Sequence, residues 1–404
     1  MRKTYSSRIR NRIGWALLSS LLACSYASAS DLRDPAFMGE ARQAFEGIYS
    51  LEYQEAYQEL LDLRQRYPDH PAPPLYLATV KWLQELFVRQ DLDLDRFLAP
   101  GYFAEKTDRE MPQEDRKDFL RFIDESRDKS QAMLEKDAGN KDARYFMGAY
   151  YGIRASFAIT IDHSVKQAFD YGKKAYKYHH ALVEEDPAYY DAYMSVGMYE
   201  YIVGNLPWYI KWLASIFGYS GSESRGFEYL NKAKEKGSYV ATDAAVLQMV
   251  LYVREERYKK ALENAGRLHR RYPRNYLLHI NQAQILEMMG ESGRSVETYR
   301  QVLQKADAET KNYHRLEANK LRYKVAAKFE QMGEVEKSLE ELQVIIDDPG
   351  AESSQRVVAH LYAARLLERN DRAGEAAGHY KAVLESENHG NSHRLARRGL
   401  QRIG

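Results

Sequence analysis

Apolar residues recur at intervals of three and four positions along almost the whole chain, while strictly alternating runs of β-branched residues are scarce. The first pattern is that of an apolar stripe on a helix, and the second would indicate a half-buried strand. Proline, which interrupts helices, occurs only 11 times in 404 residues. The chain is therefore predicted to be all-α.

Small residues and prolines repeat in a fixed register. A small residue lets two helices approach closely, and a proline ends a helix because it lacks the N–H and restricts the residue before it. Each alanine that precedes a proline by twelve positions is predicted to close one antiparallel helical hairpin. The pairs are Ala56 and Pro68, Ala175 and Pro187, and Ala261 and Pro273.

A related series continues toward the C-terminus. Two further stretches, 142–159 and 189–203, look like first helices of a hairpin, with Gly148 and Gly197 at the crossing point. Each copy of the C-terminal series consists of a small residue, a turn residue, a second small residue and a large residue, in that order. Its copies are Ala283, Gly290, Ser295 and Tyr299, then Ala326, Gly333, Ser338 and Leu342, and finally the incomplete Ala364, Ala376 and Tyr380.

These residues resemble the tetratricopeptide repeat family, whose degenerate unit of roughly 34 residues has small residues at two helix-crossing points and a proline near its end. The resemblance implies an α-α superhelix, a solenoid of antiparallel helical hairpins. It also implies a non-enzymatic scaffold, without a cofactor, that binds a protein or peptide partner in a concave groove. The spacing from Ala283 to Ala326 exceeds the family's unit, so longer helices or loops are expected.

Breaks in the periodicity divide the chain into segments. Pro100-Gly101 and Met111-Pro112 mark turns in a stretch without regular periodicity. The predicted segments are 30–90 for N-terminal hairpins, 91–112 for an irregular insertion, 113–388 for the solenoid with an apolar insertion at 204–222, and 389–404 for a basic C-terminal capping helix.

The N-terminus is predicted to be a targeting segment, because five basic residues precede the apolar run 13–23 and no acid occurs before Asp31. A transmembrane helix needs about 20 apolar residues, so this short run favours a cleaved signal peptide. Two cleavage sites compete. Ala27-Ser28-Ala29 fits an ordinary signal peptide, 1–29, whereas Leu21-Leu22-Ala23-Cys24 resembles a bacterial lipobox, with signal 1–23 and a lipid on Cys24. Either site predicts an exported protein, in the periplasm or on the periplasmic face of the outer membrane.

Composition and charge narrow the chemistry further. Cys24 is the only cysteine, so ordinary cleavage would leave a mature chain without disulfides or zinc–cysteine sites. Loss of the five basic signal residues would leave 54 basic against 58 acidic residues, a net charge of −4. A surface of mixed charge gives no reason to expect nucleic-acid binding.

One acidic stretch begins like a calcium-binding loop. Asp91, Asp93 and Asp95 have the required spacing, but Arg96 stands where glycine is needed, and Tyr102 where glutamate is needed. A solvated loop is therefore predicted instead of a metal site.

The other candidates for chemistry also fail. His179 and His180 are neighbours on a predicted helix, so they face different sides and cannot chelate one ion together. The nucleophile elbow, the metalloprotease helix and the phosphate-binding glycine loop are absent from the sequence. The sequence thus predicts no enzyme and no metal.

Tyrosine is unusually frequent, with 32 residues against 13 phenylalanines. A tyrosine packs an apolar ring while its hydroxyl remains available to a partner. Most of these rings are predicted to pack helices together. Because first helices form the inner wall in this repeat class, the candidates for partner binding in the groove are Tyr145, Tyr151, Tyr193 and Tyr201.

The most apolar stretch of the mature chain is 206–217, in which Lys211 is the only charged residue. If it is exposed, Trp208 and Trp212 would bind a partner or a membrane surface. The other reading is that the stretch folds back and plugs the solenoid. Membrane contact at this stretch, together with a lipid on Cys24, defines an alternative function, an outer-membrane-tethered lipoprotein that assists envelope assembly or transport.

Overall fold

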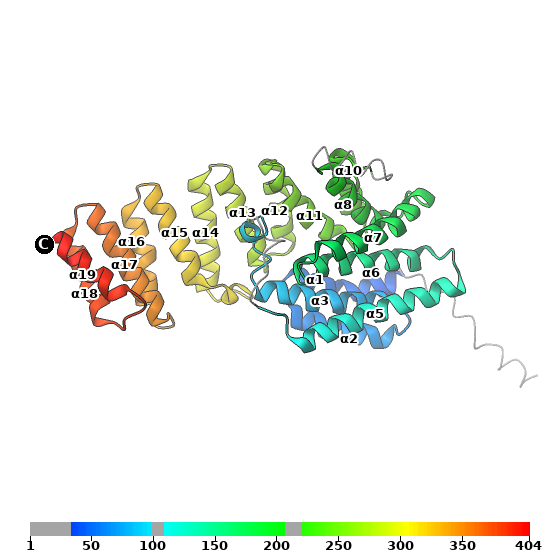
Figure 1. Ribbon diagram of the computed structural model, residues 1–404, viewed down its shortest axis with the longest axis horizontal. Coiled ribbons are helices and arrows are strands. Elements are labelled where there is room, and N and C mark those ends of the chain that lie inside the picture. Colours follow the sequence, from blue (N-terminus) through cyan, green and yellow to red (C-terminus); the bar gives the residue numbers. More distant parts are fainter. Residues whose placement is uncertain (1–33, 99–108, 207–219) are drawn as a thin grey trace, which may run out of the picture.

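The computed structural model describes residues 34–98, 109–206 and 220–404, and within these ranges the regular elements are all helical (Figure 1). The prediction of an all-α chain is confirmed. The predicted signal peptide, the lipidation site Cys24, and both Trp208 and Trp212 lie outside the described residues.

Consecutive helices pack as antiparallel pairs, and we refer to the first and second helix of each pair. A last helix, α19 (Ser392–Ile403), covers the end of the array, and α4 (Leu94–Phe97) is inserted within the second pair. The pairs are α1 (Pro35–Tyr49) and α2 (Tyr53–Arg66), α3 (Ala72–Val88) and α5 (Gln113–Lys136), α6 (Lys141–Thr160) and α7 (Val165–Glu185), α8 (Tyr193–Gly204) and α10 (Glu223–Lys236), α11 (Ala241–Arg254) and α12 (Tyr258–Arg271), α13 (Tyr276–Met288) and α14 (Ser292–Asp307), α15 (Ala318–Gln331) and α16 (Val335–Asp347), and α17 (Ser353–Arg369) and α18 (Ala373–Glu385).

The fold is therefore the predicted α-α superhelix of tetratricopeptide type. Two short 3₁₀ turns, η1 (Tyr190–Ala192) and η2 (Tyr313–Arg315), lie in connections between pairs. The helices α2, α7 and α12 end just before the three predicted prolines, Pro68, Pro187 and Pro273.

The small residues of the predicted register lie where the two helices of a pair cross. The Ser295 hydroxyl donates to the carbonyl oxygen of Ala283 over 2.8 Å, and the Ser338 hydroxyl donates to that of Ala326 over 2.8 Å. Each bond links the second helix to the first at the crossing point. The alanines of the register are all buried: Ala175 is 3% exposed, and Ala56, Ala261, Ala283, Ala326, Ala364 and Ala376 are 0% exposed.

In the pair of α8 and α10, backbone packs directly against backbone. A Cβ atom added to Gly197 would lie 3.0 Å from the carbonyl oxygen of Gly226. A Cβ atom on Gly148 of α6 would lie 2.2 Å from the ring of His179 on α7. Both glycines therefore occupy crossing points, as predicted, because a larger residue would force the helices apart.

The turn between α1 and α2 packs against the middle of the chain. The Nδ2 of Asn275 donates to the carbonyl oxygen of Tyr49, and that of Asn312 donates to Ser50, both over 2.7 Å. The Nη1 of Arg315 donates to the carbonyl oxygen of Leu51 over 2.8 Å. The N-terminal pair is therefore fixed to connections that follow it by more than two hundred residues.

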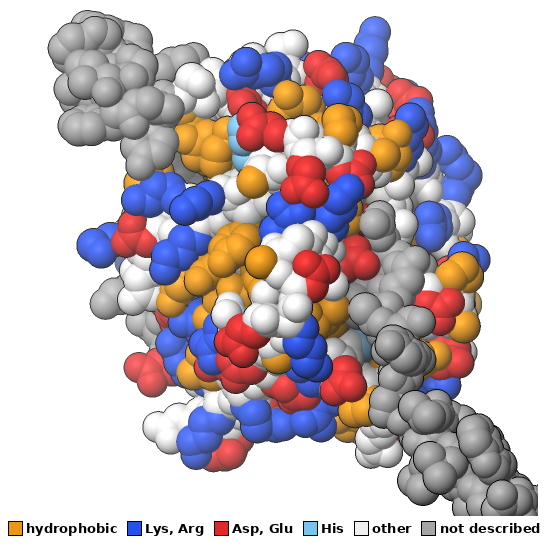
Figure 2. Space-filling view, turned by 90° about the vertical axis from the view of Figure 1, so that its right-hand side faces the viewer, with side chains coloured by type: hydrophobic (Ala, Val, Ile, Leu, Met, Phe, Trp, Pro, Cys, Tyr) orange, Lys and Arg blue, Asp and Glu red, His pale blue; other side chains and the backbone are white. Residues whose placement is uncertain are grey.

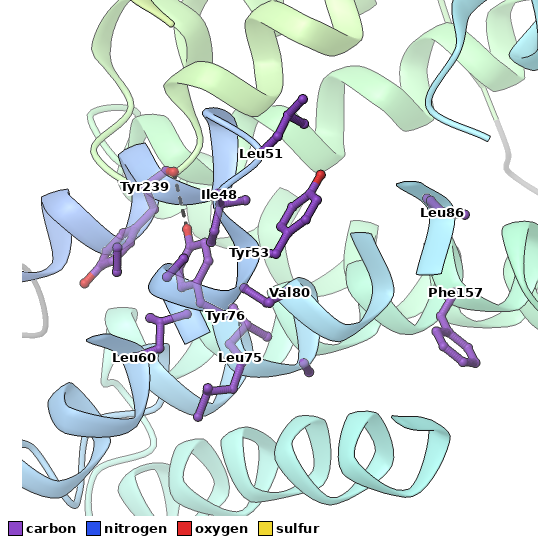
Figure 3. Packing of buried hydrophobic residues seen from close by; sticks show 14 of the residues in the cluster. Ile48, Leu51, Tyr53, Leu60, Leu75, Tyr76, Val80, Leu86, Phe157 and Tyr239 are labelled. Atoms are coloured by element: carbon purple, nitrogen blue, oxygen red, sulfur yellow. Dashed lines mark hydrogen bonds between the residues drawn. The ribbon is translucent and has the colours of Figure 1, made fainter. Parts of the chain in front are cut away.

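Aromatic and aliphatic residues form a core behind this turn (Figure 3). The Tyr76 hydroxyl donates to the carbonyl oxygen of Tyr239 over 3.3 Å, which joins α3 to the connection before α11. Figure 1 shows the consequence: α1 to α3 lie beside α6 and α7, while the helices after α13 extend away from them. We call the segment 318–403, which contains α15 to α19, the C-terminal arm.

Candidate functional site

Three of the four tyrosines predicted to line a groove are buried. Tyr145, Tyr193 and Tyr201 expose 3%, 6% and 2% of their surface. The Tyr145 ring stacks on His179 at 5.1 Å, and the Tyr193 hydroxyl donates to the carbonyl oxygen of Pro187. The Tyr201 hydroxyl donates to the carboxylate of Glu255. The prediction that these rings form an exposed groove is wrong, because they pack one helix against the next.

The fourth, Tyr151, is half-buried between α6 and α7. Its ring stacks on Tyr178 at 5.8 Å and on Tyr171 at 6.3 Å. The ammonium group of Lys174 lies 5.1 Å from its centroid, a cation–π contact. Tyr151 therefore belongs to an aromatic layer that joins the two helices of one pair.

The adjacent histidines do face different sides, as predicted. His179 is buried, with its Nε2 2.8 Å from the carbonyl oxygen of Tyr145, and burial lowers its pKa to about 4. His180 is half-exposed, with its Nδ1 3.4 Å from the Glu184 carboxylate. The described ranges contain no cluster of three or more His, Cys, Asp or Glu side chains suited to a metal ion.

A second register identifies the residues that face inward. These residues are counted from the crossing alanine of the first helix of each pair. Two of them lie six and two positions before this alanine, and the other two lie one and five positions after it. The tyrosines above fall three or four positions from Gly148 or Gly197, on the packing faces. We call the following set the inner face: Leu277, Asn281, Gln284 and Met288 on α13; Lys320, Lys324, Ala327 and Gln331 on α15; Val358, Tyr362, Arg365 and Arg369 on α17.

Residues 90–96, which we call the inserted segment, contact the inner face of α13 and the first half of α15. The Nζ of Lys320 donates to the Oε1 of Gln90 over 2.9 Å. Leu94 is only 2% exposed and packs into a cluster from α11, α12 and α13. This part of the inner face is therefore occupied by the protein's own residues.

The three aspartates of the inserted segment contact three separate groups. Asp91 is buried and its Oδ1 lies 2.7 Å from the Nε of Arg96. Asp93 caps α4 and accepts a hydrogen bond from the Nε2 of Gln284 over 3.0 Å. The Nζ of Lys324 donates to Asp95 over 2.8 Å. The three carboxylates have different partners, and Asp91 and Leu94 are buried, so the prediction of a solvated loop is wrong for this segment.

Burial and neighbouring charges shift the pKa in opposite directions at Asp91 and at Lys324. Burial raises the pKa of Asp91, although Arg96 and Arg89 oppose this shift. Burial also opposes a charge on Lys324, yet its contacts with Tyr299 and Asp95 raise the pKa of this amine overall. Lys324 therefore stays protonated at neutral pH and pairs with Asp95 as a cation.

On α17, three of the four inner-face residues are exposed. Val358 exposes 51% of its surface, and Arg365 and Arg369 are also exposed. The Tyr362 hydroxyl donates to Glu330 over 2.6 Å, and the Nη1 of Arg369 donates to the same carboxylate over 2.8 Å. These partners belong to the C-terminal arm itself, so the contacts stiffen the surface without covering it.

The helix α19 adds positive charge at the end of the array. Its Arg402 donates to Glu368 over 2.6 Å, and hydrogen bonds from Arg402 and Tyr380 lower the pKa of Glu368 to about 2. Its other arginines, Arg394, Arg397 and Arg398, are exposed and form no ion pair with a described residue. The end of the arm therefore carries an excess of cations.

Helix pairs in a fixed crossing register define the class of this molecule, a helical-repeat solenoid of tetratricopeptide type. No family model and no curated protein sequence matches the chain. Solved structures do resemble the chain, and three of them are described next.

The human IFIT1 dimer with PPP-AAAA is 14% identical, covers 92% of this chain and 85% of its own, and gives a TM-score of 0.34. Yeast Tom70 is 10% identical and gives a TM-score of 0.31, and the match covers 89% of this chain and 87% of the Tom70 chain. TTC0263, a thermophilic TPR protein in Thermus thermophilus, is 14% identical and gives a TM-score of 0.19, and the match covers 59% of this chain and 90% of the TTC0263 chain. Similarity at this level carries no argument about function, which has to come from the surface of this chain.

Proposed function

We propose that the protein is a non-enzymatic interaction scaffold that binds a segment of a partner protein on the inner face of its C-terminal arm. One observation carries the proposal, a contrast along a single face. The protein's own segment contacts Gln284, Lys320 and Lys324, and Gln284 is buried, whereas Arg365, which has the register position of Gln284 on α17, is exposed. Val358 adds an exposed aliphatic side chain to the exposed arginines of this helix.

The sequence supports an extracytoplasmic setting for this scaffold. The basic N-terminus and the short apolar run 13–23 have the composition of a signal for export. We therefore place the scaffold in the periplasm or on the periplasmic face of the outer membrane. Labelling cells with a palmitate analogue, with and without Cys24→Ala, separates the two cleavage sites, because only a lipoprotein would carry the label on Cys24.

Site-specific photo-crosslinking tests the partner surface. A photoreactive amino acid at Val358 should form adducts with a partner protein in cells that produce this chain. The matched control is Val344 on the second helix α16, since the two valines expose 51% and 44% of their surface. Adducts at both positions alike, or at neither, would contradict the proposed surface.

A second candidate function is that of an outer-membrane-tethered lipoprotein that assists envelope assembly or transport and touches the membrane. Val165, Phe169 and Ile202 are exposed by 64%, 53% and 48%. Tyr176 stacks on Tyr199 at 3.8 Å, so the middle of α7, the helix of Val165 and Phe169, packs beside the middle of α8, the helix of Ile202.

Figure 2, which faces the right-hand side of Figure 1, shows hydrophobic side chains at the surface between charged ones. Among the described residues, no helix is both long and apolar enough to cross a membrane. Contact would therefore be made at the membrane surface. Flotation of unlipidated protein with vesicles of phosphatidylglycerol and phosphatidylethanolamine tests this candidate, and protein that stays at the bottom of the gradient removes it.

A further inference from the structure

Two histidine rings meet between the helices of the last pair. His360 lies on α17 and His379 on α18, and their Nδ1 atoms are 2.9 Å apart. The ring centroids are 5.2 Å apart, and the ring planes make an angle of 51°. One nitrogen of each imidazole therefore faces the other across the space between the two helices.

A single hydrogen atom holds this contact together. A neutral imidazole carries a hydrogen on one nitrogen and a lone pair on the other, so one Nδ1 donates and the other accepts. Burial lowers the pKa of both His360 and His379, so both rings are mostly neutral at neutral pH. The neutral ring is the form that binds a metal ion. A cation can therefore take the place of the shared hydrogen.

The separation of the two nitrogens selects among metal ions. A bond from an imidazole nitrogen to a metal ion such as Zn²⁺ is about 2.0–2.1 Å long. Two such bonds that end on nitrogens 2.9 Å apart meet at an angle of about 90°. Neighbouring ligands make this angle in a square-planar site, which Cu²⁺ prefers. A tetrahedral site, which Zn²⁺ prefers, would hold the nitrogens about 3.3 Å apart.

The side chains can adjust to an ion at this position. The χ2 torsion of histidine has a broad energy minimum, so the rings can rotate until both lone pairs point to one ion. Cu²⁺ also binds nitrogen ligands more tightly than the other divalent ions of the first transition row. The geometry and the order of affinities thus favour the same ion.

Carboxylates next to the two rings add negative charge. Glu375 precedes His379 by four positions, on the same face of α18, and its charge acts on His379. Asp347, at the end of α16, acts on His360. Glu375 is paired with Arg372, whose guanidinium group also contacts Glu336 and so has a second acidic partner. The charges of Asp347 and Glu375 favour a cation between the rings.

The pair is open to solvent. Both rings are only half-buried, and Gly378 is the direct neighbour of His379. A Cβ atom on Gly374 or Gly378 would meet no atom within 4 Å, so there is free space beside this part of α18. Because the described ranges hold no cluster of three suitable side chains, water would supply the other ligands.

We propose that His360 and His379 form a binding site for Cu²⁺, in which the two Nδ1 atoms are neighbouring ligands and water fills the remaining positions. The ion would join α17 to α18 in place of the hydrogen bond between the rings. Sequence analysis predicted no metal, because a separation of 19 positions matches none of the motifs considered there. The site goes beyond the proposed function and does not depend on a partner at Val358.

A copper titration of the full chain tests the site. The protein carries no affinity tag and has Cys24→Ala, so that neither added histidines nor the single thiol binds copper. At neutral pH, with glycine as a competing ligand, we expect one tightly bound Cu²⁺ per chain. Its electron paramagnetic resonance spectrum should be tetragonal and show hyperfine coupling to two imidazole nitrogens.

Removal of either ligand should abolish this spectrum. His360→Gln and His379→Gln should each weaken copper binding by about tenfold or more and leave coupling to one imidazole at most. The matched control, His180→Gln/His314→Gln, removes two histidines elsewhere on the surface and should change neither affinity nor spectrum. Circular dichroism confirms that each variant is folded.

Three results would overturn the site. Copper that binds equally well to both single variants would be an adventitious ion only. A copper spectrum without coupling to two imidazoles would contradict the assigned ligands. Displacement of Cu²⁺ by an equal concentration of Zn²⁺ would contradict the square-planar geometry.

Discussion

Replacing Gly226 by alanine should lower the free energy of unfolding by about 3 kcal/mol, because the new methyl group would meet the backbone of the partner helix. A Cβ atom there would lie 2.8 Å from the amide nitrogen of Tyr201 and 2.9 Å from the carbonyl oxygen of Gly197. A side chain could rotate away from such a contact, but the backbone of a packed helix cannot. The helices α8 and α10 would have to separate, with loss of close packing along their length. Urea denaturation followed by circular dichroism measures the loss.

The same substitution at Gly172 is the control. Gly172 lies within α7, and a Cβ atom there would meet no atom within 4 Å. Alanine has the higher helix propensity, so Gly172→Ala should leave stability unchanged or raise it by up to about 1 kcal/mol. If both variants lost stability equally, the effect would not come from the crossing of α8 and α10.

The second large effect is expected at Arg322, where removal of the guanidinium group in Arg322→Ala should cost about 3 kcal/mol or more. Arg322 is 6% exposed, and its Nη2 lies 2.6 Å from both carboxylate oxygens of Asp307. Its Nη1 donates to Glu341 over 3.0 Å. Without Arg322, the buried carboxylate of Glu341 would lose its closest partner, and an uncompensated buried charge is strongly destabilising.

A double variant separates the loss of a partner from the loss of volume. Arg322→Met with Glu341→Met replaces the buried pair by apolar side chains and should recover most of the stability. Arg300→Ala is the milder comparison, because Arg300 is 40% exposed and its Nε lies 3.5 Å from Glu341. It should cost less than about 1 kcal/mol. A double variant as unstable as Arg322→Ala would show that the ion pair is not the cause.

The crossing points of the hairpins could be predicted from the sequence because close helix contacts restrict residue size at fixed spacing. Ala283 and Ser295, and likewise Ala326 and Ser338, are separated by twelve positions and meet through a hydrogen bond. Gly148 and Gly197 were recognised for the same reason. Because close helix packing limits residue size at these positions, the small residues can be recognised in a single sequence, without an alignment of related sequences.

Tyr145, Tyr193 and Tyr201 are buried, contrary to their predicted exposure in a groove, because they were chosen by helix and by residue type, without the face of the helix. Tyr145 lies three positions before Gly148, and Tyr201 four positions after Gly197, on sides that pack against neighbouring helices. The inner-face register could have been counted from Ala364. It leads to Val358, Arg365 and Arg369, which the sequence analysis did not consider.

The occupied part of the inner face could not have been predicted. Gln90 contacts Glu317 and Lys320, and Asp93 contacts Gln284, across about two hundred residues of sequence. Local periodicity describes each helix and its hairpin partner, but it does not determine where the array turns back upon itself. In sequence, 91–96 therefore looked like an ordinary solvated loop.

Cysteine labelling tests most directly the claim that the inserted segment packs against the solenoid at α13, whereas the inner face of α17 is exposed. The chain has a single natural cysteine, so Cys24→Ala gives a background without thiols. In folded protein, a maleimide should modify Val358→Cys at the rate of an exposed thiol and Leu94→Cys at least about a hundredfold more slowly, with equal rates in urea. Equal rates in the folded protein would contradict the claim, because they would show that the inserted segment does not cover the inner face.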